Sequence, residues 1–444
     1  MEQQERAEET AMKLIQRMLT VVAACALICG TAGCGASSSR QAPNQLTIAW
    51  WGSQGRNEKQ RQVNELFIEQ HPGTRIDGQF SQYGDYWQKL ATAAAGRQMP
   101  DIVAMDLPYM NQYIGNGLII DLIPYIDDGT LDVGQVSEAV LATGMADGVV
   151  YAISSGVNAP AVIYDKTLLD SLGITIGPDW TLDDFVRISK QVYARTGTKT
   201  NAGYYRDTNV LEYLLRAQHE RLYSDDGINV TDPAAVEPYF AMFQNGIEEG
   251  WHLEPTVFAE INLSVMNQDP LVAYADNAHR SWCAFGWSNS LSGMQSLVTN
   301  GDDLALAPWP SDDVTASNYI HPAQYFAITR DCENPELAAQ WIDFYINNRQ
   351  ANEIMGVDRG MPVNGIMVDA VWDQLSADDR ESIAYVREMV EPASSTINPP
   401  SPAKAVKVNA AIMPGIQEQL LYRRIDARQA SRMFVDQASD AMRQ

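Results

Sequence analysis

From residue 46 onward, short apolar runs alternate with segments in which apolar residues recur at helical spacing. Residues 46–51 form a compact apolar run that predicts a strand, and Val63 and Phe67 share one face of the helix expected after it. Two more strands are expected at residues 74–80 and 102–105, each followed by a helical segment. This βαβαβα order predicts an α/β fold with largely parallel sheets, whose ligand sites lie in the loops after the strands.

A second domain is expected to begin after residues 149–153, where a predicted strand leads into a run of small residues. Thr181 and Asp184 have the spacing of a capping box at the start of a helix. Residues 324–328 predict a strand that suits the sheet of the first domain, and apolar residues at helical spacing over residues 405–443 predict a final helical segment.

The N-terminal segment has the features of an export signal. Lys13 and Arg17 precede an apolar run over residues 19–29. This run is shorter than the roughly 20 apolar residues of a membrane-spanning helix, but it has the length of a signal-peptide core. The chain is therefore expected to act outside the cytoplasm.

Cys34 follows several small residues and so resembles the lipidated cysteine of bacterial lipoproteins, whose thiol receives a diacylglyceryl group. The resemblance implies a lipoprotein signal peptide over residues 1–33, lipidation of Cys34, and a lipid-anchored tether over residues 34–45 that holds the protein at the cell membrane. Two alternatives remain: Met12 could be the true start, and an ordinary signal peptide could be cleaved near Ala32.

The composition excludes several classes of protein. Asp and Glu number 56 against 31 Lys and Arg, which gives a formal charge of −25, and so acidic a surface repels nucleic acid. Five Cys in 444 residues exclude a disulfide scaffold, although Cys283 and Cys332 could be either reduced or bonded to each other. The His residues are scattered and no metal-binding motif is present, so no cofactor or metal is expected.

Several short segments carry a resemblance to a known family. They are LTIAWWG at residues 46–52, YGDYW at 83–87, MPDIVAMD at 99–106, DDG at 225–227 and GMPV at 360–363. Their order and spacing, over nearly the whole chain after the signal, resemble the family 1 extracellular solute-binding proteins, the lipid-anchored receptors of bacterial ABC sugar importers. Trp50 and Trp51 with Gln54 and Arg56 are most similar to members that bind oligosaccharides from plant polysaccharides, including pectin-derived ones.

This resemblance implies two α/β lobes that close around a ligand like a hinged clamp. It places hinge crossings near residues 154–158, near residues 320–324, and after Pro362. The N-terminal lobe is expected to comprise residues 46–154 and about 324–370. The C-terminal lobe is expected to comprise residues 155–323 and about 371–444.

The resemblance also implies a function without chemistry. The protein is expected to capture a carbohydrate, specifically an oligosaccharide, as a monomer, and to deliver it to the permease of an ABC transporter encoded elsewhere. No phosphate-binding loop of an ATPase is present in the sequence, as expected if the ATPase of the transporter is a separate protein.

A sugar site needs aromatic faces for the C–H surfaces of the ligand and fixed polar groups for its hydroxyl rim. The aromatic candidates are Trp50, Trp51, Tyr83, Trp87 and Trp287. The polar candidates are Arg56, Asp106, Asn158, Asn289 and Arg359. Trp287 and Asn289 belong, with Trp282, to a segment expected to form a loop after a strand of the second lobe.

Most of these candidates have a structural alternative. Because successive strand residues point to opposite faces, at most one of Trp50 and Trp51 is expected in the cleft, and the other in the core. Trp87 could belong to a buried helix face instead. Asp106 could accept sugar hydroxyls or could cap the helix that follows it.

Three polar candidates have alternatives of another kind. Arg56 and Arg359 could each pair with a uronate carboxylate through a bidentate fork, or could form ordinary surface ion pairs. Asn158 could bind ligand or fix the hinge turn, and Trp309, between two prolines, could be only a loop anchor.

Two rival functions share many of these features. A secreted glycoside hydrolase would also be acidic and exported, but it would need two carboxylates across the glycosidic bond. A surface sensor or adhesin could use the same clamp to report a sugar to a membrane partner.

Overall fold

The computed structural model describes residues 44–203, 208–224, 227–263, 265–399, 401–402 and 404–443. The predicted signal peptide, Cys34 and most of the predicted tether lie outside the described residues, as do Asp225 and Asp226. None of the helices in the described part is both long and apolar enough to span a membrane.

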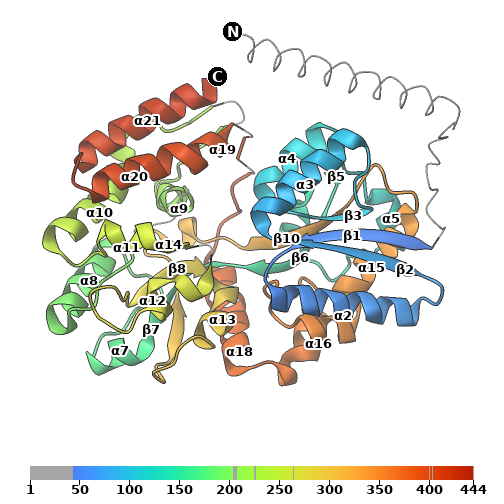
Figure 1. Cartoon of the computed structure of the whole chain (residues 1–444), viewed down its shortest axis with the longest axis horizontal. Coiled ribbons are helices and arrows are strands. Elements are labelled where there is room, and N and C mark those ends of the chain that lie inside the picture. Colours follow the sequence, from blue (N-terminus) through green and yellow to red (C-terminus); the bar gives the residue numbers. More distant parts are fainter. Residues whose placement is uncertain are drawn as a thin grey trace, which may run out of the picture. The chain divides into compact units, whose positions relative to one another are not determined.

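The first sheet contains five strands in the order β2-β1-β3-β10-β6 (Figure 1). Their bounds are Gln45–Trp51 (β1), Arg75–Ser81 (β2), Ile102–Met105 (β3), Ile153–Asn158 (β6) and His321–Ile328 (β10). β1 is parallel to β2 and β3, whereas β10 is antiparallel to β3 and β6. The prediction that the strand near residues 324–328 joins the first sheet is therefore confirmed.

Helices lie on both sides of the first sheet, with α3 and α4 on one side and α2 and α16 on the other (Figure 1). The helices of this part are α2 (Gln54–Gln70), α3 (Tyr83–Gly96), α4 (Leu107–Gly115), α5 (Ile123–Asp127), α6 (Glu138–Ala142), α15 (Pro335–Asn347), α16 (Arg349–Met355) and α17 (Gly365–Val371). Ser53 caps α2 and Asn334 caps α15, each accepting a backbone N–H from the first turn.

The single strand expected at residues 149–153 is wrong. The chain instead forms a two-residue strand, Val149–Val150 (β5), paired with Met145–Ala146 (β4), and then turns before β6. The turn forms because the N–H groups of Tyr151 and Ala152 both bond to the carbonyl of Gly144, at 3.0 and 3.3 Å.

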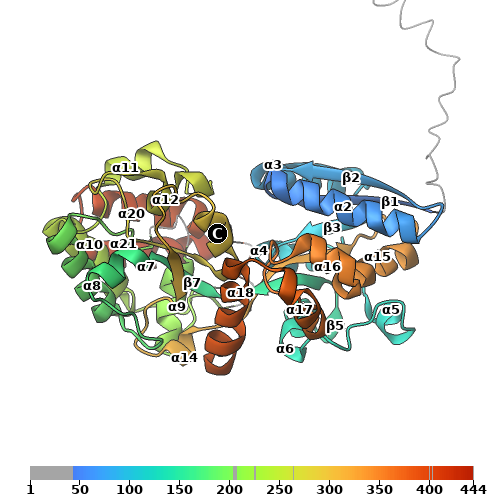
Figure 2. The same ribbon diagram turned by 90° about the horizontal axis from the view of Figure 1, so that it is seen from below.

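The second sheet has three strands in the order β8-β7-β9: Pro160–Asp165 (β7), Cys283–Trp287 (β8) and Leu304–Ala307 (β9). Both pairings are antiparallel. The expectation of largely parallel sheets is therefore wrong for this second sheet. β7 continues directly from β6 through Ala159 and lies among the helices of this part of the chain (Figure 2). β8 and β9 both pair with β7.

The remaining helices surround or adjoin the second sheet. They are α7 (Lys166–Ser171), α8 (Leu182–Thr196), α9 (Asn209–Ala217), α10 (Glu237–Glu249), α11 (Pro255–Glu260), α12 (Pro270–Ala273), α13 (Leu291–Gln295), α14 (Val314–Ser317), α18 (Ala377–Ala384), α19 (Ala405–Lys407), α20 (Met413–Leu421) and α21 (Ala427–Arg443). The capping box predicted at Thr181 and Asp184 is confirmed at the start of α8. The final segment is helical as expected, but Arg423, at a φ of 56°, separates α20 from α21.

Two large apolar clusters form the interior. One surrounds the first sheet and continues along one face of the second, where it includes Ala161 and Ile163. The other lies against the opposite face of the second sheet, where Val162 joins it. The alternation of neighbouring residues between the two clusters follows the two-residue period of a strand. The lobe boundaries in the sequence remain a prediction.

Candidate functional site

We call the first sheet and its helices the first lobe, and the second sheet and its helices the second lobe. A cavity of about 480 Å³ lies where strand ends of the first sheet meet residues of the second lobe. Eight of the ten predicted binding residues line it: Trp51, Arg56, Tyr83, Asp106, Asn158, Trp287, Asn289 and Arg359. Trp50 and Trp87 do not. Residues more than 300 positions apart in the sequence thus share one cavity wall.

Trp50 and Trp51 point to opposite faces of β1, as the strand period requires. Trp51 lines the cavity and packs its ring 5.5 Å from that of Tyr83. Trp50 is only 1% exposed and lies over Gly78 of β2, where an added Cβ would come within 2.5 Å of the indole. Trp87 is also buried, and its ring stacks on Tyr109 at 3.7 Å. The structure therefore assigns Trp50 and Trp87 to the apolar interior.

Asp106 follows β3 and carries out the capping role that was its structural alternative. One carboxylate oxygen accepts the N–H of Leu107 at 2.9 Å, and the other accepts the hydroxyl of Tyr83 at 2.8 Å. Burial raises the pKa of the Asp106 carboxyl, and these two hydrogen bonds oppose the rise. Capping and cavity lining coincide here, because the first turn of α4 begins at the cavity wall.

Trp287, the last residue of β8, provides the aromatic face from the second lobe. Its ring lies 4.2 Å from the ring of His321 and 6.5 Å from that of Tyr319, both of which also line the cavity. Burial lowers the pKa of His321 to about 4, so this ring is neutral near pH 7. The segment predicted as a loop is a loop only in part: Cys283–Trp287 form strand β8, whereas Asn289 lies in the turn after it. Trp282, before β8, is fully buried and does not line the cavity.

Arg56 and Asn289 meet at the backbone of Asp358. The Nε of Arg56 donates to the Asp358 carboxylate at 2.7 Å, and a terminal nitrogen of Arg56 donates to the Asp358 carbonyl at 2.8 Å. The Nδ2 of Asn289 donates to the same carbonyl at 3.4 Å. Arg56 thus has the ion pair that was its structural alternative, and that pair forms part of the cavity wall.

The loop that carries Arg359 is held against β6 by backbone contacts. Val157 and Met361 exchange two N–H to carbonyl hydrogen bonds, each of 2.8 Å. Gly360, which directly precedes Met361, has a φ of +87°. A Cβ at Gly360 would lie 2.3 Å from both the Asn158 side-chain oxygen and the Val157 carbonyl. Only glycine fits this close approach without displacement.

We expect Gly360→Ala to lower the free energy of unfolding by about 1–2 kcal/mol, because the new methyl group meets backbone at a φ that L residues rarely adopt. Urea unfolding measures the effect. Gly365→Ala is the matched control, since a Cβ at Gly365 meets nothing within 4 Å and Gly365 lies at the start of α17. Equal stabilities of the two variants would contradict this account of the loop.

Sequence reasoning missed ten further polar or aromatic residues of the wall, two of which are Ser290 and Ser401. The others are Asn209, Glu212, Arg216, Tyr319, His321, Gln324, Asp358 and Asn398. Arg216 holds part of the wall together: its guanidinium donates to Ser317, Ser395, Thr396 and Asn398 and lies 4.9 Å from the ring of Tyr319. Arg216 lies on the strongly amphipathic helix α9 and is only 6% exposed. A charged residue on the buried face of such a helix is the signal that could have identified it.

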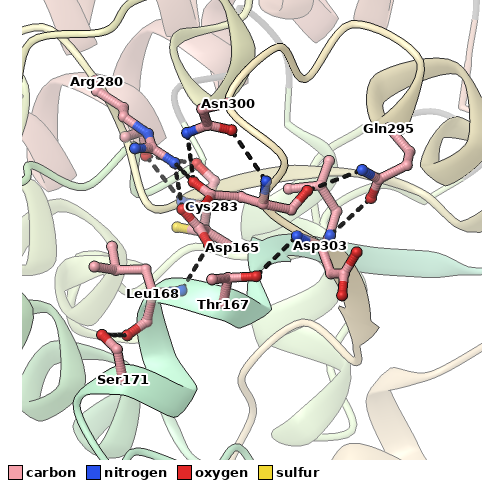
Figure 3. Close-up of polar contacts among 12 residues, drawn as sticks. Asp165, Thr167, Leu168, Ser171, Arg280, Cys283, Gln295, Asn300 and Asp303 are labelled. Carbon is pink, nitrogen blue, oxygen red and sulfur yellow. Dashed lines mark hydrogen bonds and ion pairs between the residues drawn. The ribbon is translucent and has the colours of Figure 1, made fainter.

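A second polar cluster lies apart from the cavity, at the end of β7 (Figure 3). Arg280 forms ion pairs with Asp165 and Asp302, and Asp165 also accepts the N–H of Leu168 at the start of α7. The hydroxyl oxygen of Thr167 accepts the N–H of Asp303 at 2.9 Å. Burial raises the pKa of Asp165, an effect that the Leu168 N–H and Arg280 oppose. The cluster joins the ends of β7, β8 and β9 and is structural.

The described residues contain no group of three or more His, Cys, Asp or Glu side chains that could hold a metal ion. Cys283 and Cys332 are both free thiols, which settles the alternative left open by the sequence.

A family model described as bacterial extracellular solute-binding protein matches residues 64–378. Two curated relatives are the lactose-binding protein of Rhizobium radiobacter, 24% identical over 51% of this chain, and the arabinooligosaccharide-binding protein of Halalkalibacterium halodurans, 28% identical over 32% of it. These matches cover 52% and 31% of the relatives, so the chain spans about half or less of their length. A solved structure from Alicyclobacillus acidocaldarius, an extracellular solute-binding protein of family 1, is 25% identical with a TM-score of 0.71 and covers 90% of this chain and 98% of its own.

Proposed function

Because the chain belongs to the bacterial extracellular solute-binding proteins, we propose that it captures an oligosaccharide and delivers it to the permease of an ABC importer. It binds the sugar without changing it. The mature protein is a monomer held at the outer face of the cell membrane by a lipid on Cys34. Two relatives named for lactose and for arabinooligosaccharides support a carbohydrate ligand.

The observation that carries this proposal is the pairing of aromatic and polar groups around one cavity. Trp51 and Tyr83 provide aromatic surface from the first lobe, and Trp287 provides it from the second. Aromatic faces of this kind pack on the C–H surfaces of a sugar ring. Polar groups from both lobes, including Asn158 and Asn289, surround them and suit a ring of hydroxyls.

A glycoside hydrolase remains the rival, because three carboxylates line the cavity. Asp358 is engaged by Arg56, and Asp106 accepts two hydrogen bonds while capping α4. Glu212 accepts the hydroxyl of Thr208 at 2.7 Å. A carboxylate held by a guanidinium or committed to a helix cap is poorly suited to act as a free general acid or nucleophile.

We expect the full chain to unfold at a higher temperature in the presence of a carbohydrate ligand, because a ligand that binds only the native state stabilises it. At a ligand concentration about 100 times the Kd, the gain is about 2.7 kcal/mol. The measurement is thermal unfolding against a panel of neutral and acidic oligosaccharides, followed by recovery of the sugar. Recovery of the sugar unaltered supports binding without turnover. A shortened sugar would favour the hydrolase, and no shift across the panel would contradict the proposal.

A further inference from the structure

The two arginines predicted as carboxylate partners have different surroundings. Arg56 is paired with Asp358 at 2.7 Å, so its charge is already balanced. Arg359 is only 4% exposed and forms no ion pair within 4 Å among the described residues. Its terminal nitrogens donate to the side-chain oxygen of Gln324 and, at 3.4 Å, to the carbonyl of Trp51. Its Nε has no hydrogen-bond partner in the part of the chain that the structure describes.

A buried cation without a counter-ion is costly, because neutral acceptors replace only part of the hydration that the guanidinium loses. Burial, and then repulsion from Arg56, lower the pKa of Arg359 to about 9. The group therefore keeps its charge near pH 7. Since Arg359 also lines the cavity, the missing negative charge can be supplied from the cavity.

The acidic side chains of the wall supply that charge only in part, because the Asp358 carboxylate attracts Arg359 but also has to balance Arg56. Asp358 pairs with Arg56 instead of Arg359, and Glu212 accepts the hydroxyl of Thr208. Asp106 accepts the Tyr83 hydroxyl and the Leu107 N–H. Each carboxylate has donors of its own, whereas the guanidinium of Arg359 has only neutral acceptors.

Arg216 is the other buried arginine of the wall, and it is arranged differently. Its Nε and both terminal nitrogens donate to oxygen atoms of Ser317 and of residues 395–398. Its hydrogen-bonding capacity is thus largely spent on holding the wall together. Arg359 lines the cavity and has no carboxylate bonded to it among the described residues, which makes it the better partner for an anionic ligand group.

We propose that the ligand carries a carboxylate that pairs with Arg359, so that the cavity takes an acidic oligosaccharide containing uronic acid. This inference rests on the proposed capture of an oligosaccharide. A carboxylate matches the planar guanidinium in a bidentate arrangement, whereas a neutral hydroxyl leaves the buried charge unbalanced.

The first test changes only the charge of the ligand. Isothermal titration of the full chain with an oligogalacturonide and with its fully methyl-esterified form compares two sugars of the same length. We expect the free acid to bind at least about 30-fold more tightly. Equal or tighter binding of the ester would overturn the inference. Binding of neutral oligosaccharides with no binding of the acid would overturn it while leaving the proposed function standing, and failure of every sugar would overturn both.

The second test separates pairing from structural support. Arg359→Met is expected to reduce affinity for the acid about 30-fold more than it reduces affinity for the ester. Arg61→Met, on the exposed surface of α2, is the matched control and should leave both affinities unchanged. If Arg359 only holds the loop in place, both affinities fall together, and that result would overturn the proposal.

Discussion

Replacement of Arg280 by Met is expected to lower the free energy of unfolding by about 3–5 kcal/mol. The side chain of Asp165 is completely buried, and Arg280 is its ion-pair partner. Without Arg280, the carboxylate would remain buried beside the like charge of Asp302, and among the described residues the Leu168 N–H would be its remaining hydrogen-bond donor. Urea unfolding at pH 7 measures the loss. Arg187→Met, which breaks an exposed ion pair with Asp184, is the control and should cost less than about 1 kcal/mol.

The Arg280→Met defect should shrink in acid. Burial raises the pKa of Asp165 and Arg280 opposes the rise, so removing Arg280 raises the folded-state pKa further above the unfolded value. The folded variant then binds a proton more readily than the unfolded chain. Its deficit is fully present above the raised pKa and is lost as the pH falls through it. A deficit that stays constant between pH 7 and pH 5 would contradict this assignment.

A substitution of Asp165 itself tests, without a change of pH, whether an unpaired buried charge causes the Arg280→Met defect. Asp165→Asn removes the buried charge and keeps a side-chain oxygen that can accept the Leu168 N–H. Arg280→Met combined with Asp165→Asn is therefore expected to be more stable than Arg280→Met alone. If the double variant is less stable, loss of packing rather than an unpaired charge explains the Arg280 defect.

The first lobe could be predicted from sequence because its signals are local. β1 and β3 are short apolar runs, and the capping residues and helical periodicity that follow them lie within a few positions. The strands of the second lobe were harder to predict from sequence. The first four residues of β8 are buried, and a strand buried on both faces lacks the polar alternation that identifies a strand. That absence explains why the segment around Trp287 was interpreted as a loop.

The cavity wall could be predicted only in part. Trp51 and Asp106 follow from the rule that strand ends build sites in α/β sheets. The ion pair of Arg56 with Asp358 could not be predicted, because 302 positions separate the two residues. Their contact depends on how the loop before Gly360 packs on β6. The difference between a paired Arg56 and an unpaired Arg359 is likewise a product of tertiary packing.

Trp287→Ala is expected to weaken binding of the oligosaccharide by about 30-fold or more. Trp287 is only partly buried, lies at the end of β8, and is the aromatic face that the second lobe contributes to the cavity. Its removal takes away that contact surface and leaves the ring of His321 without its neighbour at 4.2 Å. Because the rest of β8 stays paired with β7, the fold should persist. Isothermal titration measures the affinity, and thermal unfolding without ligand checks the fold.

Trp372→Ala is the matched control for this prediction. Trp372 is also partly buried, but it packs beside Arg380 and does not line the cavity. The same atoms are removed in both variants, so a general loss of packing would affect stability in both and affinity in neither. Loss of affinity in Trp287→Ala alone would locate the sugar against the second-lobe aromatic face. An affinity within about threefold of the unmodified protein would instead mean that the ligand is held by the first lobe, around Trp51 and Tyr83, and that the two lobes do not share it.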